Sequence, residues 1–372
     1  MKKIAVIGAN EPSLSFYRQA KALGYHIIGI AWAKGAVCKQ YCDRFYPISF
    51  TEKDEVLKVC QQEKIDGITS FSLESALPTV IYVAQHMGLV SNGYKCIKLT
   101  ANKFAQREAF RDAGLNVPFF QRVKNADSVK IEKFRFPIIV KPVDSGGSQG
   151  ITKLDNKSGL KEALDYAIEH SRTEEAIVEE FIEGREFSVE YLSCKGHHYN
   201  LQITDKVTSG APHFIEVSHH QPADLSETQR INIKSVVEKG LTALKIENSP
   251  SHTEIKMTPQ GELYIIEIGA RMGGDNITSD LVRLSTGYDM VKGCIDLACG
   301  DFVEPMLTKQ MFSGVYFYSK LASHIGEVIK NHEKYPEIVE WELTTDDLPE
   351  ANSNADRGGY LLYQSEKGRL NF

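Results

Sequence analysis

The chain has 372 residues, of which 42% are hydrophobic and 25% are charged, as in an ordinary globular protein. Its formal net charge is -6 and it has no basic stripe, which argues against a nucleic-acid partner. No apolar run approaches the roughly 18 residues of a membrane span, so we expect no membrane partner. The length exceeds what one hydrophobic core usually supports, and it predicts two or three domains.

The seven cysteines are odd in number and scattered along the chain, which favours free thiols in a reducing compartment. The apolar run near the first residue ends after about six residues, which is shorter than the apolar region of a secretory signal. We therefore expect a cytoplasmic protein whose first residues form a β-strand.

Residues 1–95 alternate short apolar runs with amphipathic stretches, the order that builds a doubly wound parallel sheet. The expected strands are Lys3–Gly8, His26–Ala31 and Gly67–Ser70, and the expected helices are Ser13–Leu23, Glu52–Glu63 and Ala76–Met87. The first strand-to-helix turn lacks the second and third glycines of the dinucleotide fingerprint. This turn is expected either to approach a small substrate or only to close the domain.

A phosphate-binding pattern follows in the next segment. Asn102 is placed to cap a helix over Lys103–Ala113, with Lys103 in its first turn. The apolar strand Phe136–Pro142 contains Lys141 near its end, and a Gly/Ser loop over residues 144–150 comes directly after it. A strand, a Lys and a flexible loop of this kind supply charge and backbone N–H donors to a phosphate group.

Two further strands are expected to meet across Gly184, after a helix over Ser158–His170. Glu179 and Glu186 on these strands are either solvated charges or parts of a nucleotide pocket. In the second case the backbone of Glu180–Ile182 reads the edge of adenine, and Glu186 accepts the ribose hydroxyls.

A β-hairpin is predicted between Ser251 and Gly269, because Gly261 lies near the tip of a short polar connection between two runs rich in Thr, Ile and Tyr. A loop at Gln260 and Gly261 sets the register. The expected pairs are Met257 with Tyr264, Ile255 with Ile266, Thr253 with Ile268 and, on the opposite face, Glu254 with Glu267.

The two opposed acids ask for a counter-charge, because like charges directly across a strand pair are destabilising. A divalent cation with oxygen ligands supplies it, and Mg²⁺ commonly uses one or two carboxylates plus nucleotide phosphates. The alternative is an exposed hairpin whose acids point into solvent. Arg271 follows within a Gly-rich bend, before a helix expected to begin near Asp275 or Asn276, and this corner suits a phosphate or carboxylate.

The acceptor side is less defined by the sequence. His213, His219 and His220 lie in one segment, and a neutral imidazole there can bind or deprotonate an amine, although adjacent histidines are more often loop or surface groups. His219 and His220 are expected to point to opposite faces of a strand. From about residue 305 the chain is expected to be a β-rich lid with a strand over Ser313–Tyr318, and Arg357 either reaches a substrate carboxylate or forms a surface salt bridge.

Taken in this order, the motifs resemble the ATP-grasp superfamily of carboxylate–amine ligases, most closely its branch of L-amino acid ligases and carbamoyl-phosphate-synthetase-like enzymes. The resemblance implies an α/β and α+β fold: a preATP-grasp doubly wound parallel sheet (1–95), an ATP-grasp fold (96–304, with a nucleotide-binding part at about 115–190) and a β-rich C-terminal segment (305–372). The resemblance also makes a homodimer a candidate oligomeric state.

The same resemblance implies roles residue by residue. For ATP they are Lys103, Lys141, Ser145, Gly146, Gly147, Ser148, Gly150, Glu179, Glu180, Phe181, Ile182 and Glu186. For Mg²⁺, or Mn²⁺ in its place, they are Glu254 and Glu267. Arg271 would stabilise the reacting acyl phosphate, and the substrate candidates are His213, His219, Gly273, Gly274 and Asn276.

The chemistry implied is phosphorylation of a small carboxylate by ATP, followed by attack of an amine to give an amide, ADP and phosphate. Two alternatives stay open: a purine-biosynthetic type of enzyme that handles a phosphoribosyl amine or carboxylates its substrate, and an inactive nucleotide-binding regulator. Gly269 departs from the pattern, because many ATP-grasp enzymes have Asn there as a further metal ligand.

Overall fold

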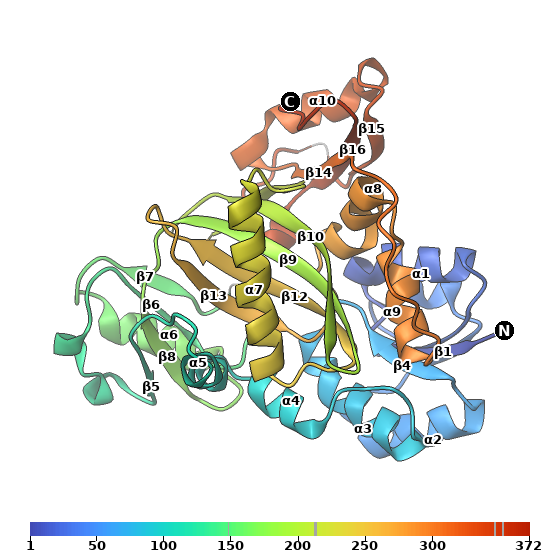
Figure 1. The fold of residues 1–372 in the computed structure, drawn as a ribbon, viewed down its shortest axis with the longest axis horizontal. Helices are drawn as coiled ribbons and strands as arrows, with labels where there is room; N and C mark the ends of the chain where they lie inside the picture. Colours follow the sequence, from blue (N-terminus) through green and yellow to red (C-terminus); the bar gives the residue numbers. More distant parts are fainter. Residues whose placement is uncertain (148, 212–213, 346, 352) are drawn as a thin grey trace.

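The computed structural model describes residues 1–372 except 148, 212–213, 346 and 352 (Figure 1). Within that part of the chain the strands form three sheets, and the long helix α7 (Glu227–Ala243) lies across the largest of them. None of the helices in the described residues combines the length and the apolar composition needed to cross a membrane.

The N-terminal sheet is parallel, with strand order β3-β2-β1-β4. Its strands are β1 (Lys3–Ile7), β2 (His26–Ile30), β3 (Arg44–Tyr46) and β4 (Gly67–Ser70), and its helices are α1 (Leu14–Ala22), α2 (Lys53–Glu63) and α3 (Leu77–Met87). Side chains alternate between faces, so Ile4 and Val6 pack in one core cluster while Ala5 and Ile7 pack in another. The predicted doubly wound sheet is confirmed.

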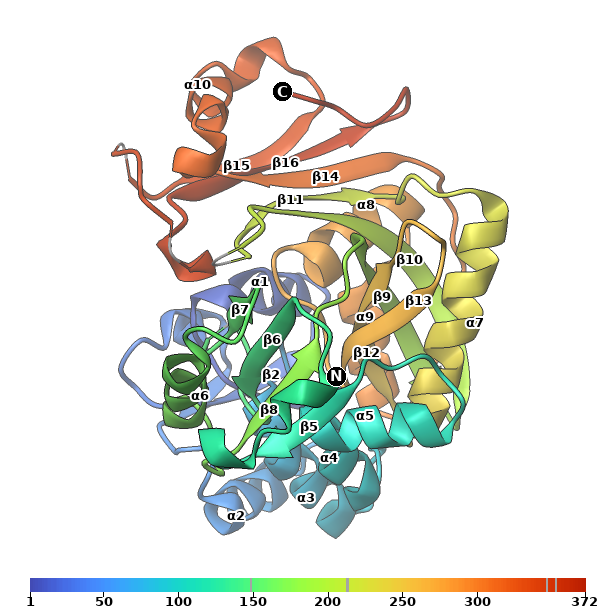
Figure 2. The ribbon, with the colours of Figure 1, turned by 90° about the vertical axis from the view of Figure 1, so that its left-hand side faces the viewer.

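A smaller antiparallel sheet, with strand order β5-β8-β6-β7, carries the predicted phosphate-binding strand (Figure 2). Its strands are β5 (Phe120–Val123), β6 (Ile138–Pro142), β7 (Thr152–Leu154) and β8 (Ala176–Glu180). Helix α6 (Leu160–Glu169) buries its apolar side against this sheet through Ala163, Leu164 and Ala167.

The largest sheet has the order β13-β12-β9-β10-β11-β14-β16-β15. Its strands are β9 (Arg185–Cys194), β10 (His197–Thr208), β11 (Glu216–Gln221), β12 (Ser249–Met257), β13 (Leu263–Gly269), β14 (Phe312–Phe317), β15 (Ile338–Leu343) and β16 (Gly359–Ser365). The C-terminal strands therefore extend the same sheet past β11, at the top of Figure 2. The prediction that two strands meet across Gly184 is wrong, because β8 and β9 belong to different sheets.

The remaining helices connect these layers. They are α4 (Tyr94–Thr100), α5 (Lys103–Asp112), α8 (Val282–Thr286), α9 (Met290–Ala298) and α10 (His324–Lys330). Helix α9 packs against α1 and β4 on one side and against β9 and β12 on the other, so it joins the parallel sheet to the large sheet. The divisions near residues 95 and 304 stay predictions.

The β12–β13 hairpin keeps the predicted pairs Thr253–Ile268 and Glu254–Glu267. Beyond Glu254 a β-bulge shifts the register by one residue, so the predicted pairs of Ile255 with Ile266 and of Met257 with Tyr264 are wrong. The observed partners are Ile265 for Ile255 and Leu263 for Met257. The bulge arises on the turn side of the acids, so their opposition is preserved.

Candidate active site

One cavity of about 510 Å³ brings together groups from all three sheets. Lys103 enters it from the start of α5, Lys141 from β6, and Glu254 and Glu267 from the hairpin. The sequence-predicted residues that line it are Lys103, Lys141, Ser145, Gly146, Gly147, His219, Glu254, Glu267, Arg271 and Gly274. Pro12, from the first strand-to-helix turn, also lines it.

The two hairpin acids face each other across the β12–β13 pair and are half-buried. Burial would raise the pKa of Glu254, but the Lys206 charge outweighs it and holds that pKa at about 2, so the carboxylate is ionised. The described residues hold no group of three or more His, Cys, Asp or Glu arranged for a metal ion. Two carboxylate ligands fit Mg²⁺ when nucleotide phosphates complete its coordination.

Each hairpin acid is paired with a lysine. Lys206 Nζ lies 2.9 Å from a Glu254 oxygen, and Lys103 Nζ lies 3.0 Å from a Glu267 oxygen. Lys103 is fixed in two further ways: Asn102 caps its helix by accepting from the Ala105 N–H, and its own N–H donates to the Val143 carbonyl at 2.7 Å. The predicted Asn102 cap is confirmed.

The loop after Lys141 is anchored at its two ends and open in its middle. The Asp144 carboxylate accepts hydrogen bonds from the Ser171 and Thr173 hydroxyls, both at 2.9 Å. Gly150 has φ +72°, and a Cβ there would lie 2.7 Å from Pro142, so this glycine is required by packing. Gly146 and Gly147 have open space around them, and Ser148 lies outside the described residues.

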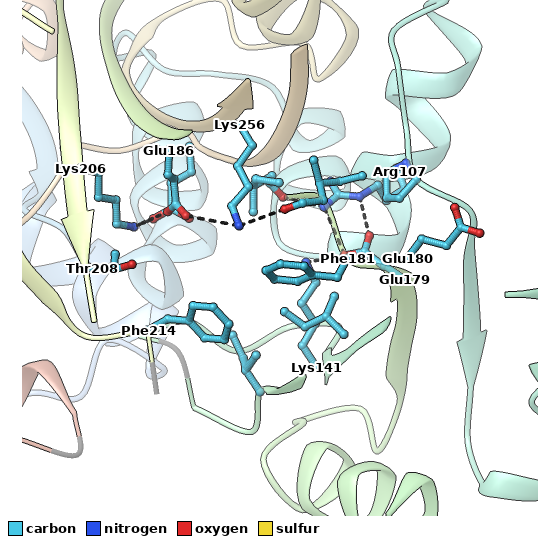
Figure 3. Close-up of a pocket in the computed structure, with 16 residues that line it drawn as sticks. Arg107, Lys141, Glu179, Glu180, Phe181, Glu186, Lys206, Thr208, Phe214 and Lys256 are labelled. Atoms are coloured by element: carbon cyan, nitrogen blue, oxygen red, sulfur yellow. Dashed lines mark hydrogen bonds and ion pairs between the residues drawn. The ribbon is translucent and has the colours of Figure 1, made fainter. Parts of the chain in front are cut away.

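A second pocket continues from the cavity toward β8, and Lys141, Lys206 and Glu254 line both spaces (Figure 3). The residues that form its apolar walls are Ile139, Ile151, Phe181, Phe214 and Ile266. The rings of Phe181 and Phe214 lie 6.0 Å apart and are tilted by 34°. Such a slot suits a flat heterocycle.

The predicted adenine segment borders this pocket, but several of its groups already have partners. The Glu180 and Phe181 N–H groups donate to the Phe119 and Pro137 carbonyls. The Ile182 carbonyl accepts a hydrogen bond from Lys256 at 3.3 Å. The roles of Glu180, Phe181 and Ile182 toward adenine therefore stay predictions.

Glu179 is the centre of a buried ion cluster, here called the Glu179 cluster, which consists of Arg107, Glu179 and Lys141. Lys141 Nζ lies 2.5 Å from one Glu179 oxygen, and Arg107 also donates to this carboxylate. Burial opposes the ionised form of Glu179, but Arg107 and Lys141 overcome it and lower its pKa to about 2. A direct contact between the Glu179 side chain and adenine stays a prediction, because that side chain is 2% exposed.

Glu186, the predicted ribose acceptor, belongs to a second group, here called the Lys206 cluster: Lys206, Glu186, Glu216 and Glu254. Lys206 Nζ lies 2.9 Å from Glu186 and 3.1 Å from Glu216. Lys256 approaches the other Glu186 oxygen at 3.7 Å, and Figure 3 shows Glu186 between the two lysines. The sequence reasoning missed Lys206, Glu216 and Arg107.

Arg271 lies where the hairpin, the loop and the parallel sheet converge. Its Nη1 donates to the Met272 carbonyl at 3.1 Å, and its buried Nε has no hydrogen-bond partner among the described residues. A Cβ on Gly269 would lie 3.2 Å from that Nε. Glycine at position 269 therefore leaves room for the Arg271 guanidinium, and the side chain of an Asn at this position would press against it.

Glu74, from the parallel-sheet segment, is a further cavity residue that the sequence reasoning missed. Burial, with the Glu267 charge second, raises its pKa. Its Oε1 atom is buried and has no hydrogen-bond partner within the described residues. Glu74 thus lies beside Arg271 and Lys103, where its carboxyl group can accept hydrogen bonds or take up a proton.

The substrate candidates fall into two sets. His219 and Gly274 line the cavity, and both ring nitrogens of His219 are without hydrogen-bond partners in the described part of the chain. Gly273 faces His252 and Glu190, and Asn276 donates to Asp280 at 3.2 Å. These two do not line the cavity, and their substrate roles stay predictions. His213 lies outside the described residues.

The helix after Arg271 begins at Ile277, later than predicted, as a π-helical turn that continues into α8. Asp275 and Asn276 before it have positive φ, 50° and 59°. Asp275 accepts from Arg357, whose guanidinium stacks 3.7 Å over the Phe317 ring. Arg357 is therefore part of the cavity wall and not a surface salt bridge.

His219 and His220 point to opposite faces of β11, as predicted. His220 is enclosed on the C-terminal side by the Ser218 and Tyr363 hydroxyls, each 2.9 Å from a ring nitrogen. Burial lowers its pKa to about 2, so it is neutral. His219 faces the cavity, 3.9 Å from Asp275.

Comparison with known proteins agrees with this geometry. Residues 134–280 match the model of the ATP-grasp domain, a span that contains the loop, both acids and Arg271. This segment is therefore similar to an ATP-grasp domain. The fold of the chain is that of an L-amino acid ligase from Bacillus licheniformis, with a TM-score of 0.83 and 23% identity over 99% of this chain and 94% of the other.

The matches to curated relatives cover a smaller share of both proteins than the structural match does. The chain is 25% identical over 270 residues to the alanine–anticapsin ligase of Bacillus subtilis, a match that covers 66% of this chain and 56% of the relative. It is 25% identical over 305 residues to an L-arginine-specific L-amino acid ligase of B. subtilis, covering 78% and 70%. The chain thus spans less than two thirds of the first of these relatives.

Proposed function

We propose that this chain is an ATP- and Mg²⁺-dependent ligase that activates a small carboxylate as an acyl phosphate and joins it to an amine. The single observation that carries the proposal is the shared cavity, in which Lys103, Lys141, both hairpin acids and Arg271 converge. Phosphoryl transfer needs mainly positioning and charge neutralisation, which this set of groups supplies.

In this proposal the nucleotide base enters the apolar pocket that Phe181 and Phe214 help to line, and the ribose lies near Glu186. Lys103 and Lys141 neutralise phosphate oxygens, and the backbone of the open loop covers them. Glu254 and Glu267 would hold Mg²⁺, which would neutralise the negative charge that develops on the phosphate group.

The chemistry then has two steps. A carboxylate oxygen of the first substrate attacks the γ-phosphorus and ADP leaves. The amine nitrogen of the second substrate attacks the carbonyl carbon, the carbon–oxygen bond to phosphate breaks, and the amine loses a proton. Arg271 stabilises the negative oxygens of both steps. The ring nitrogens of His219 have no hydrogen-bond partner among the described residues, which makes His219 the candidate that binds the amine or takes its proton.

A phosphate-release screen tests this function. Amino acids and other small carboxylates are supplied singly and in pairs with ATP and Mg²⁺, and products are identified by mass. The proposal predicts release that requires one carboxylate and one amine, with an amide as product. Release that depends instead on a phosphoribosyl amine would support the purine-biosynthetic alternative, and no release with any pair would contradict the ligase.

A further inference from the structure

Lys206 is a buried charge of the proposed nucleotide region that the proposed chemistry does not use. Its side chain is 7% exposed, and its ammonium group lies within 3.1 Å of carboxylates from three different strands: Glu186 on β9, Glu216 on β11 and Glu254 on β12. Three carboxylates thus surround one ammonium group, and Glu254 accepts a hydrogen bond from it at 2.9 Å.

The sheet itself builds this arrangement. Lys206 on β10 stands directly opposite Glu186 on β9 and opposite His219 on β11. Strand β12 lies on the other side of β9 and brings Glu254 to the same face. The cluster has one cation for three carboxylates, so Lys206 is the charge that keeps these acids together.

Lys206 forms an ion pair with one carboxylate oxygen of Glu254, which is a proposed metal ligand. One Glu254 oxygen lies 2.9 Å from Lys206 Nζ, just as one Glu267 oxygen lies 3.0 Å from Lys103 Nζ. A divalent ion that arrives alone must share both carboxylates with two fixed lysines. A nucleotide changes this balance, because its phosphates offer Lys206 and Lys103 new anionic partners.

We propose that Lys206 is a positioning residue that occupies Glu254 in the absence of nucleotide, so that the divalent metal binds weakly alone and enters together with the nucleotide. The proposal rests on the proposed metal site and goes beyond it, because it assigns the order of binding to one lysine. Removing the Lys206 charge should leave Glu216 and Glu254 without their lysine and Glu186 with Lys256 alone, which strengthens the attraction of these carboxylates for a free cation.

The test is a Mn²⁺ titration of the full chain without nucleotide, with free Mn²⁺ measured by electron paramagnetic resonance at pH 7.5. K206M should bind Mn²⁺ about tenfold or more tightly than the wild-type protein, as expected from loss of a nearby like charge. K256M is the matched control, because Lys256 contacts Glu186 at 3.7 Å and the Ile182 carbonyl but forms no ion pair with Glu254 among the described residues. It should stay within about twofold of wild type.

Equal or weaker Mn²⁺ binding by folded K206M would overturn the proposal. Circular dichroism and thermal unfolding establish that the variant is folded, and K206Q provides a second, polar replacement if K206M is not. Independently of any variant, the wild-type protein should bind Mn²⁺ more tightly when a non-hydrolysable ATP analogue is present, and unchanged binding would also count against it.

The titration separates this proposal from the metal site on which it rests. E254Q and E267Q should lose the Mn²⁺ that binds with the ATP analogue. If they keep it, the metal site itself is wrong. If they lose it while K206M leaves nucleotide-free binding unchanged, the metal site stands and only the role of Lys206 is wrong.

Discussion

The Glu179 cluster and the Lys206 cluster both combine acidic and basic side chains, but in opposite proportions. The Glu179 cluster places two cations around one carboxylate, whereas the Lys206 cluster places three carboxylates around one cation. The first lies at the small sheet beside the Gly/Ser loop, and the second lies on the large sheet beside the hairpin. Surplus positive charge suits phosphate, and surplus negative charge suits a divalent metal.

Because of this difference in charge, one cavity suits both a phosphate group and a divalent metal. Each cluster is internally balanced enough to be buried, because every buried charge has a partner of opposite sign. Each still has one sign in excess, and it is the sign that its proposed ligand neutralises. The following predictions alter one cluster or one hairpin acid at a time.

The largest expected effect is that of Glu267→Gln. Loss of a proposed metal ligand should lower Mg²⁺-dependent turnover by about 10²–10³-fold or more, the cost of removing a group that stabilises charge in the transition state. Turnover is measured by phosphate release with the best substrate pair, and folding by thermal unfolding. Glu262→Gln, at the exposed tip of the same hairpin, is the control and should be nearly unaffected. Unaffected turnover in Glu267→Gln would remove the metal assignment.

The second effect is on stability. Glu179→Gln leaves Arg107 and Lys141 buried without their anion and should cost about 3–5 kcal/mol of unfolding free energy, measured in urea. The matched control is Glu180→Gln, the next residue, whose partner Arg135 is 89% exposed. Its cost should be below about 1 kcal/mol. Equal losses in the two variants would show that the Glu179 cluster is not a buried one.

The third effect is a dependence of stability on pH. Glu179 and Glu254 have pKa values of about 2 in the folded protein, below the usual value of about 4.3 for unfolded Glu. The folded state therefore binds protons less readily than the unfolded state. Their contribution is fully present above about pH 5 and is lost as the pH falls from about 4.3 toward 2.

Urea unfolding at a series of pH values measures this contribution. The wild-type protein should lose stability steadily through that acidic window, and Glu179→Gln should show a shallower loss because one of the two groups no longer titrates. Parallel curves for the two proteins would contradict the low pKa of Glu179.

The smallest effect is that of Gly269→Asn, which introduces the residue expected at this position from the resemblance to ATP-grasp enzymes. Its Cβ would lie 3.2 Å from Arg271 Nε, so the guanidinium must shift, and turnover should fall by about tenfold. Mn²⁺ affinity with an ATP analogue should not rise. Gly261→Asn is the control, because that position has φ +85° and open space, and Asn tolerates this conformation. Tighter Mn²⁺ binding by Gly269→Asn would contradict this reading of Gly269.

Local signals were enough to predict much of the frame. Asn102 caps its helix, and Glu254 opposes Glu267, because capping and hairpin pairing are decided within a few residues. The bulge beyond Glu254 was not predictable from the turn. Strand β12 pairs with β9 in unbroken register, and the residue left without a partner in the hairpin pairing is Ile266 on β13. A one-residue shift changes which residues are paired but not which residues the hairpin contains, so the hydrophobic composition gives no sign of it.

The charges that complete the site were harder to find. Lys206 and Glu216 can be recognised as site residues only when β9, β10, β11 and β12 are known to lie side by side. Glu74 lies in a short 3-10 helix that follows strand β4 of the parallel sheet. One signal was available and missed. Arg107 stands four residues after Lys103 on the same helix, so both must face the same side, toward the small sheet and the hairpin.

The most direct test of the central claim is a crystal structure with Mn²⁺ and a non-hydrolysable ATP analogue, in which anomalous scattering locates the metal. The account predicts one Mn²⁺ coordinated by a carboxylate oxygen of Glu254, by one of Glu267 and by nucleotide phosphate. A metal bound away from the hairpin, or phosphates that contact neither Lys103 nor Lys141, would contradict it.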